Sequence, residues 1–194
     1  MRIAVADYGA GNLRSVCSAF ARGGADPVVT NDLRDAPLAV VAGVGNAASA
    51  AVELERRGIS EQLRERVAGD RPVLGICLGM QLLFGASEEG GSGLSLLGGE
   101  VVRLRARQVP HMGWNTLAVT GSQVLAGLDG ADVYFAHSYT AAHAEAVVAV
   151  VEHDGPVVAA VERGALAGVQ FHPERSGAAG ARILANVLRW SSAA

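Results

Sequence analysis

A cysteine lies at a sharp change of pattern in the stretch LGICLGMQLLF, residues 74–84. An apolar strand pattern ends at Cys77, a helical pattern follows, and glycines stand two residues before and after it, at Gly75 and Gly79. This is the form of a nucleophile elbow, where side chains at the glycine positions would crowd the neighbouring backbone. The elbow would place the sulfur at a helix N-terminus, where amide groups favour thiolate over thiol. The backbone N–H of Leu78 would then face the oxyanion of a tetrahedral intermediate.

A second interpretation of Cys77 stays open, because an isolated cysteine is often a small buried hydrophobic residue. Cys17 lacks flanking glycines and lies on a helical apolar stripe with Leu13, Val16 and Phe20, so we expect it in the core. Two isolated cysteines also do not form the dense disulfide framework of a small secreted domain.

A thiolate nucleophile needs a base, and the segment GVQFHPE, residues 168–174, offers one. His172 follows an apolar run, and Glu174 lies two residues later, so that both side chains face the same side of an extended chain. Pro173 between them disfavours helix at His172. Glu174 could then orient the imidazole while its other nitrogen faces the thiol. Alone, His-Pro-Glu more often marks a surface turn, and only the elbow at Cys77 favours a catalytic pair.

Three further segments combine glycine with possible function. Gly43-Val44-Gly45 follows an apolar run and could present a second N–H to the oxyanion, or could be an ordinary strand-to-helix turn. DYGAGNLRS, residues 7–15, lacks the third glycine of the dinucleotide fingerprint and the lysine of the nucleoside triphosphate loop, so we expect no nucleotide site. VPHMGWN, residues 109–115, sets a tryptophan among residues that would interrupt a helix or strand. This pattern by itself favours a tryptophan packed on its own core.

The elements that would position these residues alternate along the first half of the chain. We expect strands at 2–7, 27–30, 38–42 and 72–76, and helices at 13–22, 47–57, 59–68 and 78–84. Such alternation is typical of a parallel sheet covered on both faces. After Glu100, short strands broken by glycine and polar turns indicate antiparallel strands on the same core, with a last helix at about 178–189. The predicted fold is α/β, with a mostly parallel central sheet, in one domain over residues 1–194.

Composition excludes several classes of function. The 16 basic residues are all arginine and nearly balance 19 acidic residues, so no basic stripe is available for nucleic acid. Half of the residues are hydrophobic, yet no uncharged apolar run approaches the roughly 18 residues of a membrane span. The first residues run into a predicted strand rather than a secretory signal. We therefore expect a cytoplasmic protein with no membrane or nucleic-acid partner.

The motifs together resemble a known family. GICLGMQLLF, followed nearly a hundred residues later by FHPE, is similar to the class I (triad) glutamine amidotransferases, whose fold is flavodoxin-like. Within them, the segments DYGAGNL, GVG, SEEG, PHMGWN, YFAHSY and QFHPERSG resemble, in order and spacing, the glutaminase subunits of imidazole glycerol phosphate synthases. Those subunits supply ammonia to a cyclase in histidine biosynthesis. The resemblance runs from about residue 3 to 190 and implies neither a cofactor nor a metal ion.

The resemblance implies a role for each matching residue. Cys77 would attack the carboxamide carbon of glutamine, His172 would protonate the departing ammonia, and Glu174 would orient His172. Water would then cleave the thioester. The amides of Leu78 and Val44 would form the oxyanion site. The residues implied in substrate binding are Gly43, Gly45, Gln81, Glu89, Ser138 and Tyr139. Without the resemblance, Gln81 and Glu89 would be interpreted as ordinary helix and loop polarity.

The resemblance also implies a partner, a cyclase subunit with a (βα)8 barrel, in a heterodimer. The matching residues on the partner side are Asn12, His111, Met112, Trp114 and Asn115. Trp114 would then anchor the interface, since tryptophan is enriched where large apolar area is buried between proteins. We expect low activity for the chain alone and higher activity with the cyclase.

The sequence departs from the family pattern at three positions. Ala42 stands where the family usually has proline, Ala47 replaces an aromatic residue after the oxyanion loop, and Arg175 replaces a lysine. A more flexible loop would follow from the first two. Three other functions remain open: an amidotransferase subunit for another synthase, a free-standing hydrolase of γ-glutamyl compounds, and a binding module that kept the fold without the chemistry. PHMGWN argues against the first, and the intact Cys77, His172 and Glu174 argue against the last. The hydrolase is the weaker alternative, since it would need no partner face.

Overall fold

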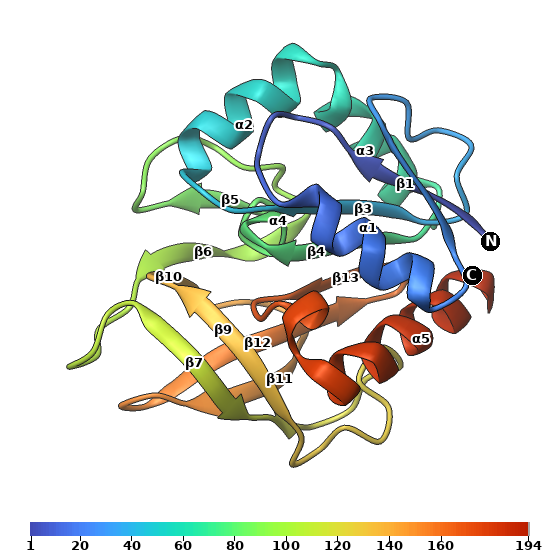
Figure 1. Cartoon of the computed structure of the whole chain (residues 1–194). Helices are drawn as coiled ribbons and strands as arrows, with labels where there is room; N and C mark the ends of the chain where they lie inside the picture. Colours follow the sequence, from blue (N-terminus) through green and yellow to red (C-terminus); the bar gives the residue numbers. More distant parts are fainter. Residues whose placement is uncertain (194) are drawn as a thin grey trace.

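The computed structural model describes residues 1–193, which form one eight-stranded sheet and two smaller sheets (Figure 1). The large sheet has the order β2-β1-β3-β4-β13-β12-β11-β8. Its first five strands are parallel: β1 (Arg2–Ala6), β2 (Asp26–Thr30), β3 (Ala39–Gly43), β4 (Val73–Cys77) and β13 (Leu166–Val169). Its last three strands run antiparallel to their neighbours: β12 (Pro156–Arg163), β11 (Val147–Glu152) and β8 (Ala118–Val119).

Helices cover both faces of this sheet, because its buried strands are apolar on both sides. Successive residues of β1 show the division: Ile3 and Val5 pack with α1 (Leu13–Arg22) and α5 (Gly177–Ala193), whereas Ala4 and Ala6 pack on the other face. The elements on that second face are α2 (Ala47–Arg56), α3 (Ile59–Ala68) and the short α4 (Leu78–Gln81). Figure 1 shows α1 and α5 on the same side of the sheet.

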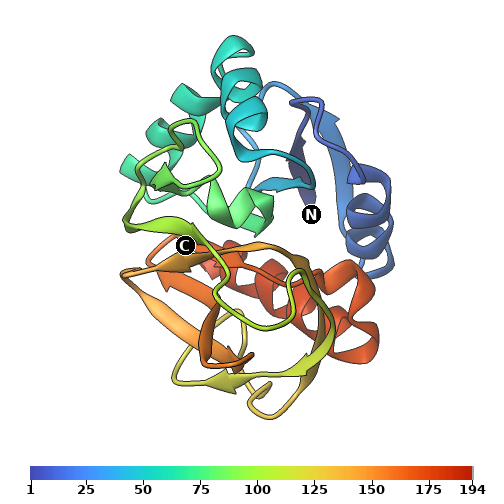
Figure 2. The ribbon, with the colours of Figure 1, turned by 90° about the vertical axis from the view of Figure 1, so that its left-hand side faces the viewer.

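Two smaller sheets lie against this core. One contains β5 (Phe84–Ser87), β6 (Leu97–Arg103) and β10 (Tyr139–Ala142). The other is a ribbon of β7 (His111–Thr116) and β9 (Asp132–His137). A 3₁₀ turn, η1 (Pro173–Arg175), precedes α5. In the rotated view of Figure 2 the ribbon and the antiparallel strands form the lower part of the molecule, and the α2 and α3 region forms the upper part.

The predicted fold class is confirmed, and two expectations about elements are wrong. The helix expected over 78–84 ends at Gln81, because Phe84 already begins β5, which pairs with β6. The segment expected to interrupt a strand forms β7 instead. Gly113 has φ +132°, which glycine adopts freely, so the ribbon continues through the position that would strain another residue. Within the described residues, no helix combines the length and apolar character needed to cross a membrane.

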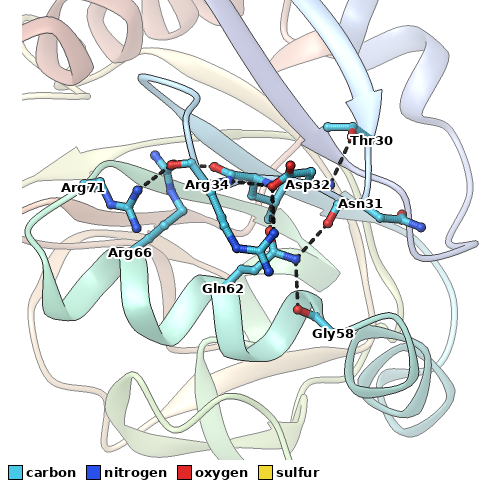
Figure 3. Close-up of polar contacts among 9 residues, drawn as sticks. Thr30, Asn31, Asp32, Arg34, Gly58, Gln62, Arg66 and Arg71 are labelled. Atoms are coloured by element: carbon cyan, nitrogen blue, oxygen red, sulfur yellow. Dashed lines mark hydrogen bonds and ion pairs between the residues drawn. The ribbon is translucent and has the colours of Figure 1, made fainter.

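A buried arginine on α3 fixes the connection between β2 and β3 (Figure 3). Arg66 is fully buried and donates to the backbone carbonyls of Leu33, Arg34 and Pro72. Burial, followed by the charge of Arg71, lowers the pKa of Arg66 to about 10. One turn earlier, Gln62 donates to the carbonyl of Asn31 and accepts from the amide of Leu33. Side chains of α3 therefore hold this loop through its backbone.

Candidate active site

Cys77 occupies a strained turn between β4 and α4. Its backbone has φ +54° and ψ −109°, a conformation that residues other than glycine rarely adopt. The flanking glycines allow the turn: a Cβ on Gly75 would lie 2.6 Å from the carbonyl oxygen of Gly79, and a Cβ on Gly79 would overlap the carbonyl of Val41. The local reason predicted for the two glycines is therefore seen in the structure. The thiol is 5% exposed at the start of α4.

His172 and Glu174 form a buried pair. Nδ1 of His172 lies 2.8 Å from Oε1 of Glu174, and both side chains are at most 5% exposed. His172 itself is extended, as expected, but the chain does not stay extended to Glu174, because Pro173 starts the η1 turn. The backbone of His172 is fixed on both sides: its N–H donates to the carbonyl of Tyr134, and its carbonyl accepts from the hydroxyl of Ser176. The imidazole therefore has a defined position.

The charges around His172 favour its protonated form. Burial, the largest single effect, lowers the pKa of His172, but Cys77 and Glu174 together outweigh it and raise the pKa to about 10. Nε2 of His172 is buried and makes no hydrogen bond of normal geometry within residues 1–193. A histidine with one nitrogen held by a carboxylate and the other unbonded near a thiol has the arrangement of a base paired with a nucleophile.

The glycine loop after β3 lies beside Cys77. Gly43 is the register partner of Cys77 in the parallel pair β3–β4, and the loop continues through Val44, which is 45% exposed. Tyr8, which sequence reasoning missed, packs against the start of the loop: its hydroxyl donates to the carbonyl of Ala42 at 3.1 Å, and a Cβ on Gly43 would overlap it. Burial and then the nearby Cys77 raise the pKa of Tyr8, so the phenol stays a donor.

The other end of the loop is held where α2 begins. The side chain of Asn46 accepts from the amide of Ser49, as a helix N-cap does. The carboxylate of Glu89 accepts from the amide of Ala47 at 2.6 Å. The structure thus brings Glu89 beside the loop that contains Gly45, although the two positions are far apart in the sequence.

A line of amide side chains leads from β10 to the sulfur. Nε2 of Gln81 donates to the carbonyl of Tyr139 at 2.9 Å and to Oε1 of Gln170 at 3.1 Å. Nε2 of Gln170 in turn donates to Sγ of Cys77 at 3.7 Å. Gln170 is fully buried and was missed in the sequence, although a polar residue inside the apolar run LAGVQF is a signal that could have marked it. Ser138, between β9 and β10, is half-buried beside Tyr139.

A small cavity of about 10 Å³ lies beside the buried pair. Its lining includes Gly11, Asn12, Gly43, Val44, His172 and Glu174. Asn12, predicted at the partner face, therefore borders the site itself. A larger hollow of about 300 Å³ between α2 and residues 91–94 contains none of the predicted site residues. Among residues 1–193, no group of three or more His, Cys, Asp or Glu side chains is placed to hold a metal ion.

Alternate side chains of β7 point to opposite faces of the ribbon, so the residues predicted at the partner face fall into an outward and an inward group. Met112 and Trp114 point outward and are 60% and 59% exposed, so the expectation that Trp114 packs on its own core is wrong. The Trp114 ring makes an edge contact with Tyr134, over which the guanidinium of Arg175 lies at 4.6 Å. A strand directs alternate side chains to opposite faces. His111 and Asn115 consequently turn inward.

His111 and Asn115 lie behind the outer face of the ribbon, and their place at a partner interface stays a prediction. His111 is 4% exposed, stacks between Phe135 and His153, and shares a hydrogen bond of 3.1 Å with His137. Asn115 donates to the carbonyl of Glu152 and contacts Nε2 of His111. Nδ1 of His137 lies 2.8 Å from the carbonyl of Tyr139, the same carbonyl that accepts from Gln81.

Comparisons with known proteins find matches over almost the whole chain. The family model described as "Glutamine amidotransferase class-I" matches residues 4–190. "Imidazole glycerol phosphate synthase subunit HisH" of Mycobacterium bovis is 45% identical over 196 residues, covering 95% of each chain. The subunit of the same name from Methanothermobacter thermautotrophicus is 44% identical over 194 residues, covering 96% of this chain and 97% of its own.

Solved structures show a similar fold. A structure titled "Crystal structure of glutamine amidotransferase" superposes with a TM-score of 0.78 at 20% identity, covering 98% of this chain and 99% of its own. The structure of PurLQS from Thermotoga maritima superposes with a TM-score of 0.77 at 20% identity, covering 97% of this chain and 98% of its own.

Proposed function

The chain belongs to the class I glutamine amidotransferases, and from this premise we propose that it is the glutaminase subunit of an imidazole glycerol phosphate synthase. In this role it hydrolyses glutamine to glutamate and ammonia and passes the ammonia to a cyclase subunit for histidine biosynthesis. The relatives that carry this subunit name cover almost the whole chain, which supports the same role here.

The observation that carries the chemistry is the buried His172–Glu174 pair with its unbonded nitrogen near Cys77. In the proposed reaction the Cys77 thiolate attacks the carboxamide carbon of glutamine. The negative charge that develops on the oxygen is stabilised by the amides of Leu78 and Val44. Protonated His172 gives its proton to the leaving nitrogen, and Glu174 keeps the imidazole oriented throughout. A water molecule, activated by the now neutral His172, then hydrolyses the thioester to glutamate.

The amino-acid end of glutamine is proposed to lie between the α2 N-terminus and β10. The carboxylate of Glu89 is well placed for the substrate ammonium because only one of its oxygens is engaged by Ala47. Gln81 offers its side-chain oxygen, since both hydrogens of its amide are used by Tyr139 and Gln170. Backbone atoms of Gly43, Gly45, Ser138 and Tyr139 complete the proposed pocket.

The partner is proposed to be a cyclase with a (βα)8 barrel, docked on the side of the molecule where Trp114 and Met112 are exposed. Two large apolar side chains standing outward on one strand face are unusual on a surface that stays in water. Asn12 lines the cavity beside His172, so the proposed docking face and the reacting groups lie close together. A cytoplasmic location belongs to this proposal, because ammonia must reach a biosynthetic partner.

The first test is glutamine hydrolysis, measured as glutamate release by the chain alone and with a cyclase and its nucleotide substrate. We expect slow hydrolysis alone and faster hydrolysis in the complex. The Cys77→Ala variant should lose on the order of 10³-fold or more in rate.

Each alternative gives a different result in the same assay. Hydrolysis that depends on Cys77 but ignores the cyclase would keep the glutaminase and refute the partner. No hydrolysis in either state would contradict the catalytic function and favour a binding module.

A further inference from the structure

The hydrogen bonds that end at Cys77 run in one direction. The carbonyl oxygen of Tyr139 can only accept, so the atom of Gln81 that contacts it must be the amide nitrogen. The second hydrogen of that nitrogen then donates to Oε1 of Gln170, which turns Nε2 of Gln170 towards Cys77. The orientation of both glutamine side chains is thus fixed by a backbone group. The sulfur of Cys77 accepts the last hydrogen bond of this chain, from Nε2 of Gln170.

Burial makes this arrangement costly unless every polar atom has a partner. Gln170 has no exposed surface, and Gln81 is 8% exposed. An unpaired amide in such a place would destabilise the fold, and an apolar residue of similar volume would fill the space without that cost. The oxygen of Gln170 accepts from Gln81, and within residues 1–193 the nitrogen donates a hydrogen bond only to Sγ of Cys77. The sulfur is therefore the site at which this side chain acts.

We propose that Gln170 is a positioning residue for the nucleophile: its amide stabilises the thiolate of Cys77 by donating to it and keeps the side-chain oxygen of Gln81 turned away from the line. A hydrogen bond donated to an ionised group favours the ionised form. The proposal rests on the proposed function only in taking Cys77 as the nucleophile. It assigns to the residue directly after β13 a task that the His172–Glu174 pair does not perform.

Gln170 also links the sulfur to the proposed glutamine pocket. Without Oε1 of Gln170, one hydrogen of Gln81 loses its acceptor, and the Gln81 amide gains freedom to rotate. Loss of Gln170 should therefore act in two places, on the ionisation of Cys77 and on the binding of glutamine. If Gln170 only filled space, its replacement would lower the stability of the fold without a specific effect on the ionisation of Cys77 or on the binding of glutamine.

The test measures thiol ionisation and needs no glutamine turnover. In a Cys17→Ala background, Cys77 is the single remaining thiol. Its reaction rate with iodoacetamide and the ultraviolet absorbance of its thiolate are followed against pH. Gln170→Leu removes the donor at similar volume, and Gln170→Glu keeps the shape but replaces the N–H by an acceptor. Gln62→Leu is the matched control, since Gln62 is also buried and hydrogen-bonded but lies on α3.

We expect Gln170→Leu to raise the midpoint of both curves by about one pH unit, which is a tenfold smaller thiolate fraction below the midpoint. Gln170→Glu should raise it further, because a carboxylate repels the thiolate. Gln62→Leu should lower stability and leave the midpoint in place. Identical midpoints in the parent and the Gln170 variants would overturn the proposal. Should Gln170→Leu fail to fold, as judged by near-ultraviolet circular dichroism, Gln170→Glu decides.

Turnover supplies an independent readout. If the parent hydrolyses glutamine, Gln170→Leu should lower kcat near neutral pH, recover part of it at higher pH, and raise KM. Loss of kcat without recovery at high pH would contradict the assigned role. If the parent does not hydrolyse glutamine, the proposed function fails, whereas the alkylation curves still decide the role of Gln170.

Discussion

The protonation of His172 depends on its two neighbours in the candidate site, Cys77 and Glu174. Its pKa of about 10 is the result of burial, which opposes the charge, and of Cys77 and Glu174, which favour it. The group therefore stays protonated at neutral pH while its nitrogen faces the thiol. This is the state from which a proton can be given to a leaving amine.

Glu174→Gln should lower the pKa of His172, because it removes a charge and weakens a hydrogen bond that hold the proton. The same raised pKa affects stability. The protonated ring contributes fully below the unfolded value of about 6.5, and the contribution is lost as the pH rises through about 10. The measurement is NMR titration of the His172 ring. An unchanged titration in Glu174→Gln would show that the carboxylate is not the source.

The grouping of Cys77, His172 and Glu174 could be predicted from the sequence, whereas Gln170 and Tyr8 could not. Cys77 is marked by two glycines, and His172 and Glu174 are neighbours in the chain, so their signals are local. Gln170 and Tyr8 reach the site only because β13 lies beside β4 and the first loop folds over β3. Such contacts depend on the order of strands in the sheet, and local patterns in a single sequence do not reveal that order.

At the scale of elements, helices whose ends carry clear signals were predicted best. Residues 13–22 and 59–68 form α1 and α3 with the expected bounds. The prediction for residues 109–115 is wrong, because the glycine within this segment does not interrupt β7. In β7 the glycine is accommodated with a positive φ, and the edge contact of Trp114 with Tyr134 joins the two strands of the ribbon.

The histidines behind the ribbon should make stability depend on pH. Burial is the main cause that lowers the pKa of both His111 and His137 to about 4. Unfolded histidine titrates near 6.5, so the neutral rings stabilise the fold fully above about 6.5, and this contribution is lost as the pH falls towards 4. The loss should be on the order of 1–3 kcal/mol for each ring.

Urea unfolding between pH 4 and pH 8 measures this dependence. His137→Gln can still accept from His111 and donate to the carbonyl of Tyr139, but it does not titrate. Its free energy of unfolding should therefore depend less on pH between 4 and 6.5 than that of the parent. Equal slopes would mean that His137 is not protonated on unfolding in this range.

Seen as a whole, the molecule presents apolar surface next to its reacting groups. The η1 turn contacts both the start of the chain at α1 and the ribbon strand β9, so Trp114, Arg175 and the cavity at Asn12 belong to one side. A partner that covered this side would also cover the cavity beside His172. The proposed transfer of ammonia needs that arrangement, since ammonia released into water is protonated and lost.

Trp114→Ala should weaken binding to the cyclase by about 2 kcal/mol or more, because its ring is 59% exposed and available to a partner. The free chain should lose at most about 1 kcal/mol of stability, from the cross-strand contact with Tyr134. Isothermal titration of the cyclase into each variant measures the affinity. Val52→Ala is the matched control, since Val52 is a 64% exposed apolar residue on α2. Similar affinities for Trp114→Ala and Val52→Ala would refute the docking face.

The glycines of the site differ in the space around them. This difference separates positions that can accept a side chain in a variant library from positions that cannot. Gly43, Gly75 and Gly79 are closed, because a methyl group at each would meet Tyr8, Gly79 and Val41 respectively. A methyl group on Gly45 would meet nothing within 4 Å, although its φ of +118° still favours glycine. A library that seeks activity on new acyl donors should therefore vary the loop after Gly43 and keep the glycines around Cys77 unchanged.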